Sequence, residues 1–561
     1  MKLRPAILDR LRSGTFDVLV VGGGINGAVT AACLAARGAK VALVDRGDFA
    51  GETSENSSNL AWGGIKYLES FEFGLVRKLC VSRNHLIDSY PSTVKEIRFF
   101  VTHEKGFRHG RLKLYLGALL YWLIGSFFTK PPRLLSVANL HAEEPVVRED
   151  RTDGGFEYSD AYFHDNDARF VWTFIRTALD HGAACANYVE STAARRESGL
   201  WHVDLQDTLG GEKLSLRAKV LVNAAGPWVD EHNARTGEQT AHQHVFSKGI
   251  HLIVPRITKS QRVLTFFADD GRLFFVIPMG HRTCVGTTDT RVNDPRAVVT
   301  DEDRDFVLSN INKRLNLDKP LTTADVLSER CGVRPLATLR EAPKARSGKP
   351  RDWMQLSRKH AVDVDEPNRH VSIFGGKLTD CLNVGDEVAR IAASLGVDLP
   401  HPSVRWYGEP PDEVRNRFFH MAALMNLDAG TEKRALEPLS ARLWRRYGIS
   451  AFEMLEAIRA DATQAELVID GTEYARCEIE HTARHEMIGK LEDFLRRRSK
   501  IAMVMRDADI HRAPGLLEAA RMFFGAAAEA KIAEYFGEAP VVAGAPKPSR
   551  ETESRAAVVV H

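Results

Sequence analysis

Three glycines near the start of the chain have the spacing of a phosphate-binding turn. Gly22, Gly24 and Gly27 follow the apolar run 17–21 (DVLVV) and precede a stretch of small residues typical of a helix. The apolar run predicts a buried parallel strand. The glycines let the backbone approach a pyrophosphate at the helix N-terminus, where free N–H groups favour anions. Asp45 ends the next predicted strand, where a carboxylate can accept hydrogen bonds from ribose hydroxyls. These residues predict a dinucleotide-binding βαβ unit, and they leave FAD and NAD as alternatives.

Four further segments predict that the chain returns to the same extended ligand. Residues 53–59 (TSENSSN) and 62–67 (WGGIKY) combine hydroxyl side chains with paired glycines, which suits packing of backbone against a flat ligand. Residues 223–228 (NAAGPW) end an apolar strand, and 374–379 (FGGKLT) form another strand, glycine turn and helix start. A helix N-terminus at this last segment could face the flavin edge on which negative charge develops during reduction. The repeated returns favour FAD.

The residues expected to hold the cofactor come from all of these segments. They are Gly22, Gly24, Ile25, Asn26, Gly27, Asp45, Thr53, Ser54, Ser57, Ser58, Trp62, Gly63, Gly64, Ala225, Gly226, Trp228, Gly375, Gly376, Leu378 and Thr379. A glycine-rich turn without a ligand and a solvated serine-rich loop are the alternatives for the first two segments.

Eight segments in order along the chain, and a ninth near its C-terminus, match the motifs of one enzyme family. They are VGGGINGA (21–28), GGIKYLE (63–69), GFEYSDA (155–161), NAAGPWVD (223–230), KGIHLIVPR (248–256), VGTTDT (285–290), GVRPL (332–336), IFGGKLTD (373–380) and RRRSKI (496–501). On these segments nearly the whole chain resembles the FAD-dependent glycerol-3-phosphate dehydrogenases of the aerobic, quinone-linked type. The resemblance implies oxidation of sn-glycerol 3-phosphate to dihydroxyacetone phosphate, with electrons passed from FAD to a membrane quinone.

A small phosphorylated alcohol needs cations for its phosphate and a base for its hydroxyl proton. By resemblance, the expected catalytic residues are His251, Arg334 and Lys377, with His251 as the general base because imidazole titrates near neutral pH. The resemblance likewise implies that the substrate is held by Lys66, Tyr67, Thr288 and Arg358. A structural histidine in a strand, and an arginine that braces a turn before Pro335, are the alternatives.

Four residues depart from the pattern of the family. The family usually has Lys or Arg at Asn59, His at Trp62, Arg at Lys66 and Thr at Asp380. Lys66 keeps the charge but loses the bidentate fork of arginine. Three alternatives follow: a dehydrogenase of a related anionic alcohol, an oxidase of the same fold that uses oxygen, and a flavoprotein without turnover.

The expected fold class is α/β, or α+β overall, in three parts. A Rossmann-like FAD-binding domain, an antiparallel-sheet substrate domain and a C-terminal α-helical cap domain follow from the motif positions and the resemblance. Residues 1–400 form the oxidoreductase region, with a discontinuous FAD-binding domain at about 14–85, 155–240 and 350–400 and substrate-binding segments at about 86–154 and 241–349. The helical domain is expected at 410–537, followed by a disordered tail at 538–561 that is rich in Ala, Pro, Ser and charge.

Apolar runs and helical periodicity predict the individual elements. Strands are expected at 17–21, 40–45, 219–223, 251–254, 273–277 and 371–374. Helices are expected at 28–37, 168–180, 301–315, 412–427, 438–446, 451–460 and 479–505. Residues 114–128 contain no charge, are flanked by basic residues and include Tyr115, Tyr121 and Trp122. This segment is a buried core helix, a segment that dips into one membrane leaflet or, least favoured because it is short, a membrane span.

The composition excludes several classes of protein. Lys plus Arg number 76 and Asp plus Glu number 74, a balance that argues against a nucleic-acid binder. The seven cysteines are scattered without CxxC spacing, so free thiols in a reducing cytosol are expected. No signal peptide is predicted. We expect a cytoplasmic protein, peripheral on the inner face of the membrane, and a homodimer remains open.

The sequence offers few candidates for a metal site, and none is predicted. His481 and His485 stand four residues apart on a predicted helix beside Glu480, but no third ligand is evident. Residues 165–167 and 363–365 lack the glycine and the terminal glutamate of an EF-hand loop. The basic triplet 496–498 is expected on a solvated or structural helix face, with contact to anionic lipid as the alternative.

Overall fold

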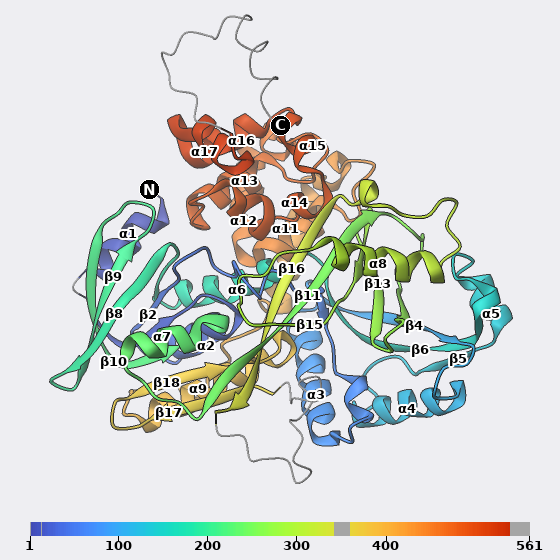
Figure 1. Ribbon diagram of the computed structural model, residues 1–561. Coiled ribbons are helices and arrows are strands. Elements are labelled where there is room, and N and C mark those ends of the chain that lie inside the picture. The colour runs from blue at the N-terminus through green and yellow to red at the C-terminus, as the bar shows by residue number, and fades with distance from the viewer. Residues whose placement is uncertain (1, 13, 341–358, 539–561) are drawn as a thin grey trace, which may run out of the picture.

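The chain folds into two β-sheets and a helical domain (Figure 1), seen in a computed structural model that describes residues 2–12, 14–340 and 359–538. Arg358 and residues 539–561 of the expected tail therefore lie outside the described residues. The helical domain stands at the top of Figure 1, the first sheet at the lower left and the second sheet at the right.

The first sheet carries the glycine turn at the ends of its parallel strands. Its strands are β1 (Thr15–Val21), β2 (Val41–Val44), β7 (Ala184–Ala186), β8 (Val189–Glu197), β9 (Leu200–Asp207), β10 (Lys213–Asn223), β17 (Ala361–Asp365) and β18 (His370–Phe374). Strands β18, β10, β1, β2 and β7 are parallel neighbours in this order. The carboxyl ends of these strands therefore meet at one edge of the sheet, where ligands bind in open α/β sheets.

Helices cover this sheet and bury its apolar strands. They are α1 (Leu3–Leu11), α2 (Ile25–Ala36), α6 (Asp167–Asp180), α7 (Val229–Thr236) and α9 (Cys381–Ser394). Helix α2 packs against both α6 and α9. All four residues of β2 are fully buried, as the continuous apolar sequence predicts for a parallel strand covered on both faces.

The second sheet is mostly antiparallel, as expected, and carries two of the predicted catalytic residues, His251 on β11 and Arg334 on β16. Its strands are β3 (Leu60–Ala61), β4 (Val94–Glu104), β5 (Arg133–Leu135), β6 (Thr152–Phe163), β11 (His242–Pro255), β12 (Val263–Phe267), β13 (Leu273–Met279), β14 (Arg282–Gly286), β15 (Thr290–Val292) and β16 (Ser328–Leu339). Within the described ranges, β4 and β12 form the one parallel pair. The domain boundary expected near 155 is wrong, because β6 pairs with β4 in this sheet through Phe163.

The remaining helices complete the substrate region and the helical domain. Beside the second sheet lie α3 (Phe73–Ser89), α4 (Arg111–Ile124), α5 (Val137–Glu143) and α8 (Asp301–Arg314). The helical domain consists of α10 (Asp412–Leu424), α11 (Leu439–Tyr447), α12 (Ala451–Ala460), α13 (Arg476–His485), α14 (Ile501–Val504), α15 (Asp507–Arg512), α16 (Leu516–Phe524) and α17 (Ala528–Phe536).

The single helix expected at 479–505 is wrong. Helix α13 ends at His485, and a π-helical turn at Asp493–Arg498 precedes α14. The Asp493 carboxylate accepts hydrogen bonds from the backbone N–H groups of Gly489 and Lys490, at 2.7 and 2.9 Å. A carboxylate that reaches back to backbone N–H groups three and four residues earlier caps the start of a new turn, as the third residue of a capping box does.

The π-helical turn fastens the helical domain to the first sheet through buried ion pairs. Arg498 donates two hydrogen bonds to the Asp48 carboxylate, both of 2.9 Å, and Arg497 donates a third of 2.8 Å. Both arginines and Asp48 are buried. The expectation of a solvated face for residues 496–498 is therefore wrong for Arg497 and Arg498, and the structural alternative is correct for them.

Helix α4 is neither the buried core helix nor a membrane span. Ala118 and Tyr121 are its buried residues, whereas Leu112, Leu116, Leu120 and Leu123 are exposed by 61%, 55%, 39% and 52%. In the described part of the chain, no helix is long and apolar enough to cross a membrane. One face of α4 thus packs on the protein and the other presents leucines to the outside, at the edge of the molecule away from the helical domain (Figure 1).

We predict that Arg498→Leu destabilises the protein, because it leaves the Asp48 carboxylate buried without its bidentate partner. Breaking a buried pair of this kind costs about 3–5 kcal/mol. The measurement is the free energy of unfolding in urea. Arg484→Leu is the control, since Arg484 is exposed and pairs with Glu480 across the helix surface. We expect this control to change the free energy of unfolding by at most about 0.5 kcal/mol. Equal effects of the two substitutions would contradict this role of Arg498.

Candidate active site

A cavity of about 450 Å³ opens at the carboxyl ends of β1, β2 and β10, around the glycine turn. Gly22 has a φ of 105°, and a Cβ atom there would lie 2.5 Å from the carbonyl oxygen of Ala224. A Cβ atom on Gly27 would lie 1.8 Å from the carbonyl oxygen of Gly22. Only glycine fits both positions. The turn is therefore held against the end of β10, and the N-terminus of α2 points into the cavity.

Polar contacts fix the walls of this cavity. The backbone N–H of Ile25 donates to Ser54 Oγ at 3.0 Å, and the side-chain amide of Asn26 donates to the carbonyl of Gly375 at 3.0 Å. The Asp45 carboxylate accepts from the N–H groups of Gly23 and Gly47, at 2.6 and 2.8 Å. Burial raises the pKa of the Asp45 carboxyl. Segments far apart in the sequence thus form one cradle, which fits the pyrophosphate and ribose of a dinucleotide.

The helical domain contributes to the same cavity, which the sequence did not predict. Arg497, Lys490 and Glu492 line it together with Arg46 and Arg235. Arg497 is oriented by Asp48 and by Asp493, to which it donates a hydrogen bond of 2.8 Å. In the sequence, the segment RRRSKI (496–501) was the one indication that this part of the helical domain matters. The single helix expected at 479–505 would not have directed these side chains into the cavity.

A second cavity of about 250 Å³ adjoins the first. Ile25, Thr53, Ser54, Gly375 and Gly376 line both, so the two are neighbouring parts of one depression. Residues of the second cavity that the sequence predicted are Ile25, Thr53, Ser54, Ser57, Trp62, Tyr67, Arg334, Gly375, Gly376, Lys377, Leu378 and Thr379. Lys359 also lines it and was not predicted.

Lys377 and two aromatic rings form one wall of the second cavity. The Lys377 ammonium lies 4.2 Å from the ring centroid of Tyr67 and 5.5 Å from that of Trp62. Contacts of this kind are cation–π interactions. Trp62 is fixed by its indole N–H, which donates to the Tyr158 hydroxyl at 3.1 Å. Trp62, where the family usually has histidine, therefore serves as an aromatic surface for the lysine.

Arg334 is held in place from the neighbouring strands. Its guanidinium donates to Thr287 Oγ1 at 3.2 Å and lies 3.6 Å from the Asp289 carboxylate. A Cβ atom on Gly249 would lie 2.2 Å from this guanidinium, so the absent side chain of Gly249 makes room for it. The Thr288 hydroxyl accepts from the N–H of Ile250 at 3.1 Å. Thr288 thus supports the strand beside Arg334 and is not among the residues that line either cavity.

His251 lies on the same sheet face as two arginines. It is paired with Arg330 across β11 and β16, and Arg334 lies four residues further along β16, so all three side chains project to one face. The ring is 2% exposed, and within the described ranges neither ring nitrogen has a hydrogen-bond partner. Burial, then Arg330 and Arg334, lower the pKa of His251 well below its ordinary value. The imidazole is therefore neutral and able to accept a proton.

Arg330 was missed by the sequence reasoning, although the register of the two strands places it opposite His251. It is fully buried and donates to Asn59 Oδ1 at 2.7 Å and to the Asp167 carboxylate at 3.0 Å. Asn59 also donates to the carbonyl of Asp165 at 3.0 Å. A neutral residue at position 59 thus fits beside Arg330, where a lysine or arginine would place a second positive charge.

The charge of Asp380, another departure from the family pattern, is compensated locally. Its carboxylate lies 2.9 Å from the Lys78 ammonium and 3.2 Å from His360 Nδ1, and it accepts from Ser82 at 3.0 Å. Burial alone would raise the pKa of Asp380, but hydrogen bonds from His360, Asn383 and Lys78 outweigh it and hold the pKa at about 2. The extra negative charge is therefore paired, and Asp380 is not among the residues that line the second cavity.

Some predicted residues lie outside the two cavities. Lys66 is exposed and lines a third, mostly apolar cavity of about 350 Å³ beside α4. Gly63 donates its N–H to Asp160 at 3.0 Å, and Gly64 packs against the Tyr67 ring. Gly63 and Gly64, like Gly27 and Ser58, are not among the residues that line the first or the second cavity.

Two parts of the chain match known families. Residues 17–355 match the family described as FAD dependent oxidoreductase. Residues 420–530 match the C-terminal domain of alpha-glycerophosphate oxidase. The glycine cradle fits a dinucleotide, and the second cavity adds the cations Arg334, Lys359 and Lys377, whereas His251 is not among the residues that line it. Together, the fold and the site define an FAD-dependent oxidoreductase.

Individual relatives narrow the family. The chain is 32% identical to the glycerol-3-phosphate dehydrogenase of Pseudomonas aeruginosa, over 87% of this chain and 92% of that protein. It is 29% identical to the aerobic glycerol-3-phosphate dehydrogenase of Bacillus subtilis, over 88% and 89%. The glycerol-3-phosphate dehydrogenase of Bacillus halodurans, solved with FAD, has the same fold, with a TM-score of 0.69 at 23% identity over 95% of each chain. The chain belongs to the FAD-dependent glycerol-3-phosphate dehydrogenase family, and its cofactor is FAD.

We predict that Gly22→Ala yields a folded protein that loses FAD on purification. A left-handed residue with a Cβ costs about 1–2 kcal/mol, and this Cβ also collides with the backbone of Ala224. The measurement is the flavin absorbance per protein chain. Gly117→Ala is the control, because a Cβ there meets nothing within 4 Å. Full flavin content in Gly22→Ala would contradict the assignment of the cradle.

Proposed function

We propose that this enzyme oxidises sn-glycerol 3-phosphate to dihydroxyacetone phosphate and passes the electrons to a membrane quinone. The observation that carries the substrate proposal is the second cavity, in which Arg334, Lys359 and Lys377 provide positive charge beside the cofactor cradle. When bound, FAD supplies the acceptor for the hydride from the substrate carbon. The residues of the chain must hold the phosphate, orient the alcohol and take its proton.

His251 is the proposed general base. A neutral imidazole can accept the hydroxyl proton, and within the described ranges neither ring nitrogen has a hydrogen-bond partner. Because the ring is 2% exposed and does not line the second cavity, this role requires the substrate to reach the ring past the residues that line the cavity. Arg330 and Arg334 would favour the negatively charged alkoxide that forms as the proton leaves. The same arginines disfavour a positive charge on the ring, so the ring is neutral before the reaction, and the proton it takes is balanced by the alkoxide that forms beside it.

The phosphate is assigned to the cations of the second cavity. Lys377, held against Tyr67 and Trp62, and Arg334, held over Gly249, are oriented before a ligand arrives. Preorganised cations lose less side-chain freedom on binding an anion. We do not retain Lys66 in this role, because it lines the apolar cavity. A carboxylated alcohol offers the same charge, and it is the remaining alternative.

The experiment is anaerobic mixing of the purified FAD enzyme with sn-glycerol 3-phosphate. The proposal requires complete bleaching of the flavin and one dihydroxyacetone phosphate per flavin. Absence of bleaching would support the non-catalytic alternative and overturn the proposal. Bleaching by a carboxylated alcohol alone would keep the enzyme class and change the substrate.

We predict that His251→Asn slows flavin reduction by about 100- to 10,000-fold, the usual contribution of a general base. Because the pKa of His251 is lowered, the neutral base persists as the pH falls below 6.5, the ordinary pKa of histidine. The wild-type rate is therefore expected to stay level through pH 6.5, without the tenfold loss per pH unit of an ordinary base. His181→Asn, which changes an exposed histidine, is the control. Normal flavin content with an unchanged rate in His251→Asn would exclude this role.

The apolar cavity beside α4 supports the quinone as acceptor. It is lined by Phe71, Phe73, Leu114 and Leu120, among other residues. Tyr158 lines this cavity, Trp62 lines the substrate cavity, and the two side chains are directly hydrogen-bonded. The hydrogen-bonded pair of Trp62 and Tyr158 thus connects the two cavities. It would give electrons a short path from the active site to a quinone in the apolar cavity. The exposed leucines of α4 continue the apolar surface outward, as expected for a protein peripheral on the cytoplasmic face of the membrane.

We predict that Leu116→Asp with Leu123→Asp reduces binding to anionic lipid vesicles and slows reduction of a long-tailed quinone. Flavin reduction by substrate should remain unchanged, since both side chains are exposed and neither lines the first or the second cavity. Vesicle sedimentation and quinone-dependent turnover are the measurements. Leu424→Asp is the matched control, because Leu424 is 74% exposed on the helical domain. Unchanged vesicle binding, or stoichiometric hydrogen peroxide in place of quinone reduction, would contradict the membrane and quinone assignments respectively.

A further inference from the structure

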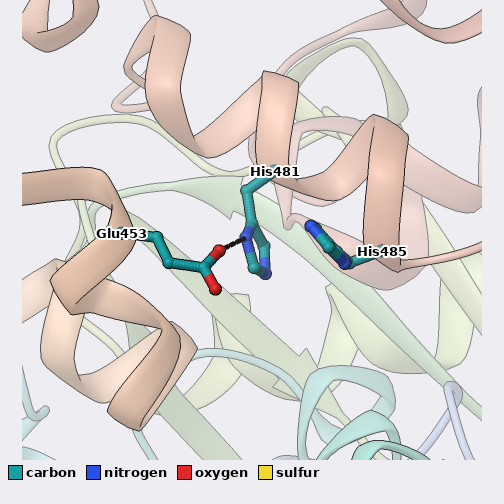
Figure 2. A group of neighbouring side chains, drawn as sticks. All are labelled: Glu453, His481 and His485. Atoms are coloured by element: carbon teal, nitrogen blue, oxygen red, sulfur yellow. Dashed lines mark ion pairs between the residues drawn. The ribbon is translucent and has the colours of Figure 1, made fainter. Parts of the chain in front are cut away.

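Two histidines and a glutamate meet in the helical domain, outside the active site. His481 and His485 lie one turn apart on α13, and Glu453 reaches them from α12 (Figure 2). One ligand atom from each of the three residues lies within 4.8 Å of the other two. The sequence pointed to Glu480 as the neighbouring carboxylate and to no third ligand. In the structure Glu480 accepts from Arg484 and Gln464, and the third ligand comes from a different helix.

We infer that Glu453, His481 and His485 bind a divalent transition metal ion of the zinc class. Two imidazole nitrogens and one carboxylate oxygen form a donor set that suits such ions and leaves further positions for water. Histidines at i and i+4 project from the same face of a helix. Figure 2 shows the Glu453 carboxylate directed at Nδ1 of His481, with the ring of His485 on the other side of His481.

The geometry needs only small side-chain movements. The Oε2 atom of Glu453 lies 3.9 Å from His481 Nδ1, whereas ligand atoms bound to one tetrahedral zinc are separated by roughly 3.3–3.5 Å. Glu453 and His485 are exposed, so both can adjust their rotamers at little cost. His481 is the fixed member, because it is buried and the Tyr447 ring packs against it edge-on at a centroid distance of 5.2 Å.

The charges around the site are compatible with a cation. Arg169 would repel a cation, but its charge is paired with the Glu486 carboxylate at 2.5 Å. The ion would link α12 to α13, two helices of the helical domain.

The test is isothermal titration of the untagged FAD enzyme with zinc chloride after dialysis against a chelator. We expect one zinc ion per chain. Glu453→Gln and His485→Gln should each weaken binding by at least about tenfold, since loss of an outer-shell partner alone costs about 10- to 100-fold. Both changes are at exposed positions, so folding is expected to survive. His420→Gln, at an exposed histidine of α10, is the matched control.

Thermal melting provides a second measurement, because an ion that binds the folded chain raises its melting temperature. Zinc should raise the melting temperature of the wild type and of His420→Gln, and not that of His485→Gln. The inference is overturned if binding does not saturate, if the two ligand variants bind zinc as the wild type does, or if His420→Gln is weakened equally. The variants leave the substrate cavity intact, so this result is independent of the proposed reaction.

Discussion

The close approach of the backbone at Gly22 and Gly27 is the constraint on which the rest of the structure depends. It lets the end of β10 lie against the first glycine turn and brings the second turn, at Gly375, to the side chain of Asn26. Strands that are far apart in the sequence therefore end at one cradle. The helical domain joins this cradle through buried pairs of Asp48 with Arg497 and Arg498, which explains why a domain without a catalytic residue still shapes the cofactor cavity.

The second feature that organises the site is an unequal distribution of charge. Arg334, Lys359 and Lys377 line the second cavity, whereas His251, buried outside its lining, is kept neutral by burial and by Arg330 and Arg334. Negative groups nearby are paired: Asp380 with Lys78 and His360, and Asp167 with Arg330. Asp380, at which this chain departs from its family, is thus neutralised by its neighbours. The second cavity keeps the positive charge that an anionic alcohol requires.

Features that short segments of sequence encode were predicted. Features that depend on the register of paired strands or on tertiary contacts were missed. The cradle is encoded by short motifs, and Gly22, Ser54, Gly226 and Gly376, which these motifs singled out, line one cavity. Lys66 and Tyr67 are adjacent in one tight turn and line different cavities, a difference that spacing alone does not reveal. Arg330 is found only once β11 and β16 are paired in register. The break after α13 and the arrival of Glu453 from α12 likewise depend on packing, and helical periodicity does not contain them.

The central claim is that the cations of the second cavity recognise the phosphate of the alcohol that is oxidised. Its most direct test compares the anaerobic rate constants of flavin reduction by sn-glycerol 3-phosphate and by glycerol, which lacks the phosphate, in the wild type and in Arg334→Met. The wild type should prefer the phosphorylated substrate by orders of magnitude, and this preference should largely disappear in the variant. Equal reduction by both alcohols in the wild type, or an undiminished preference in Arg334→Met, would contradict the account.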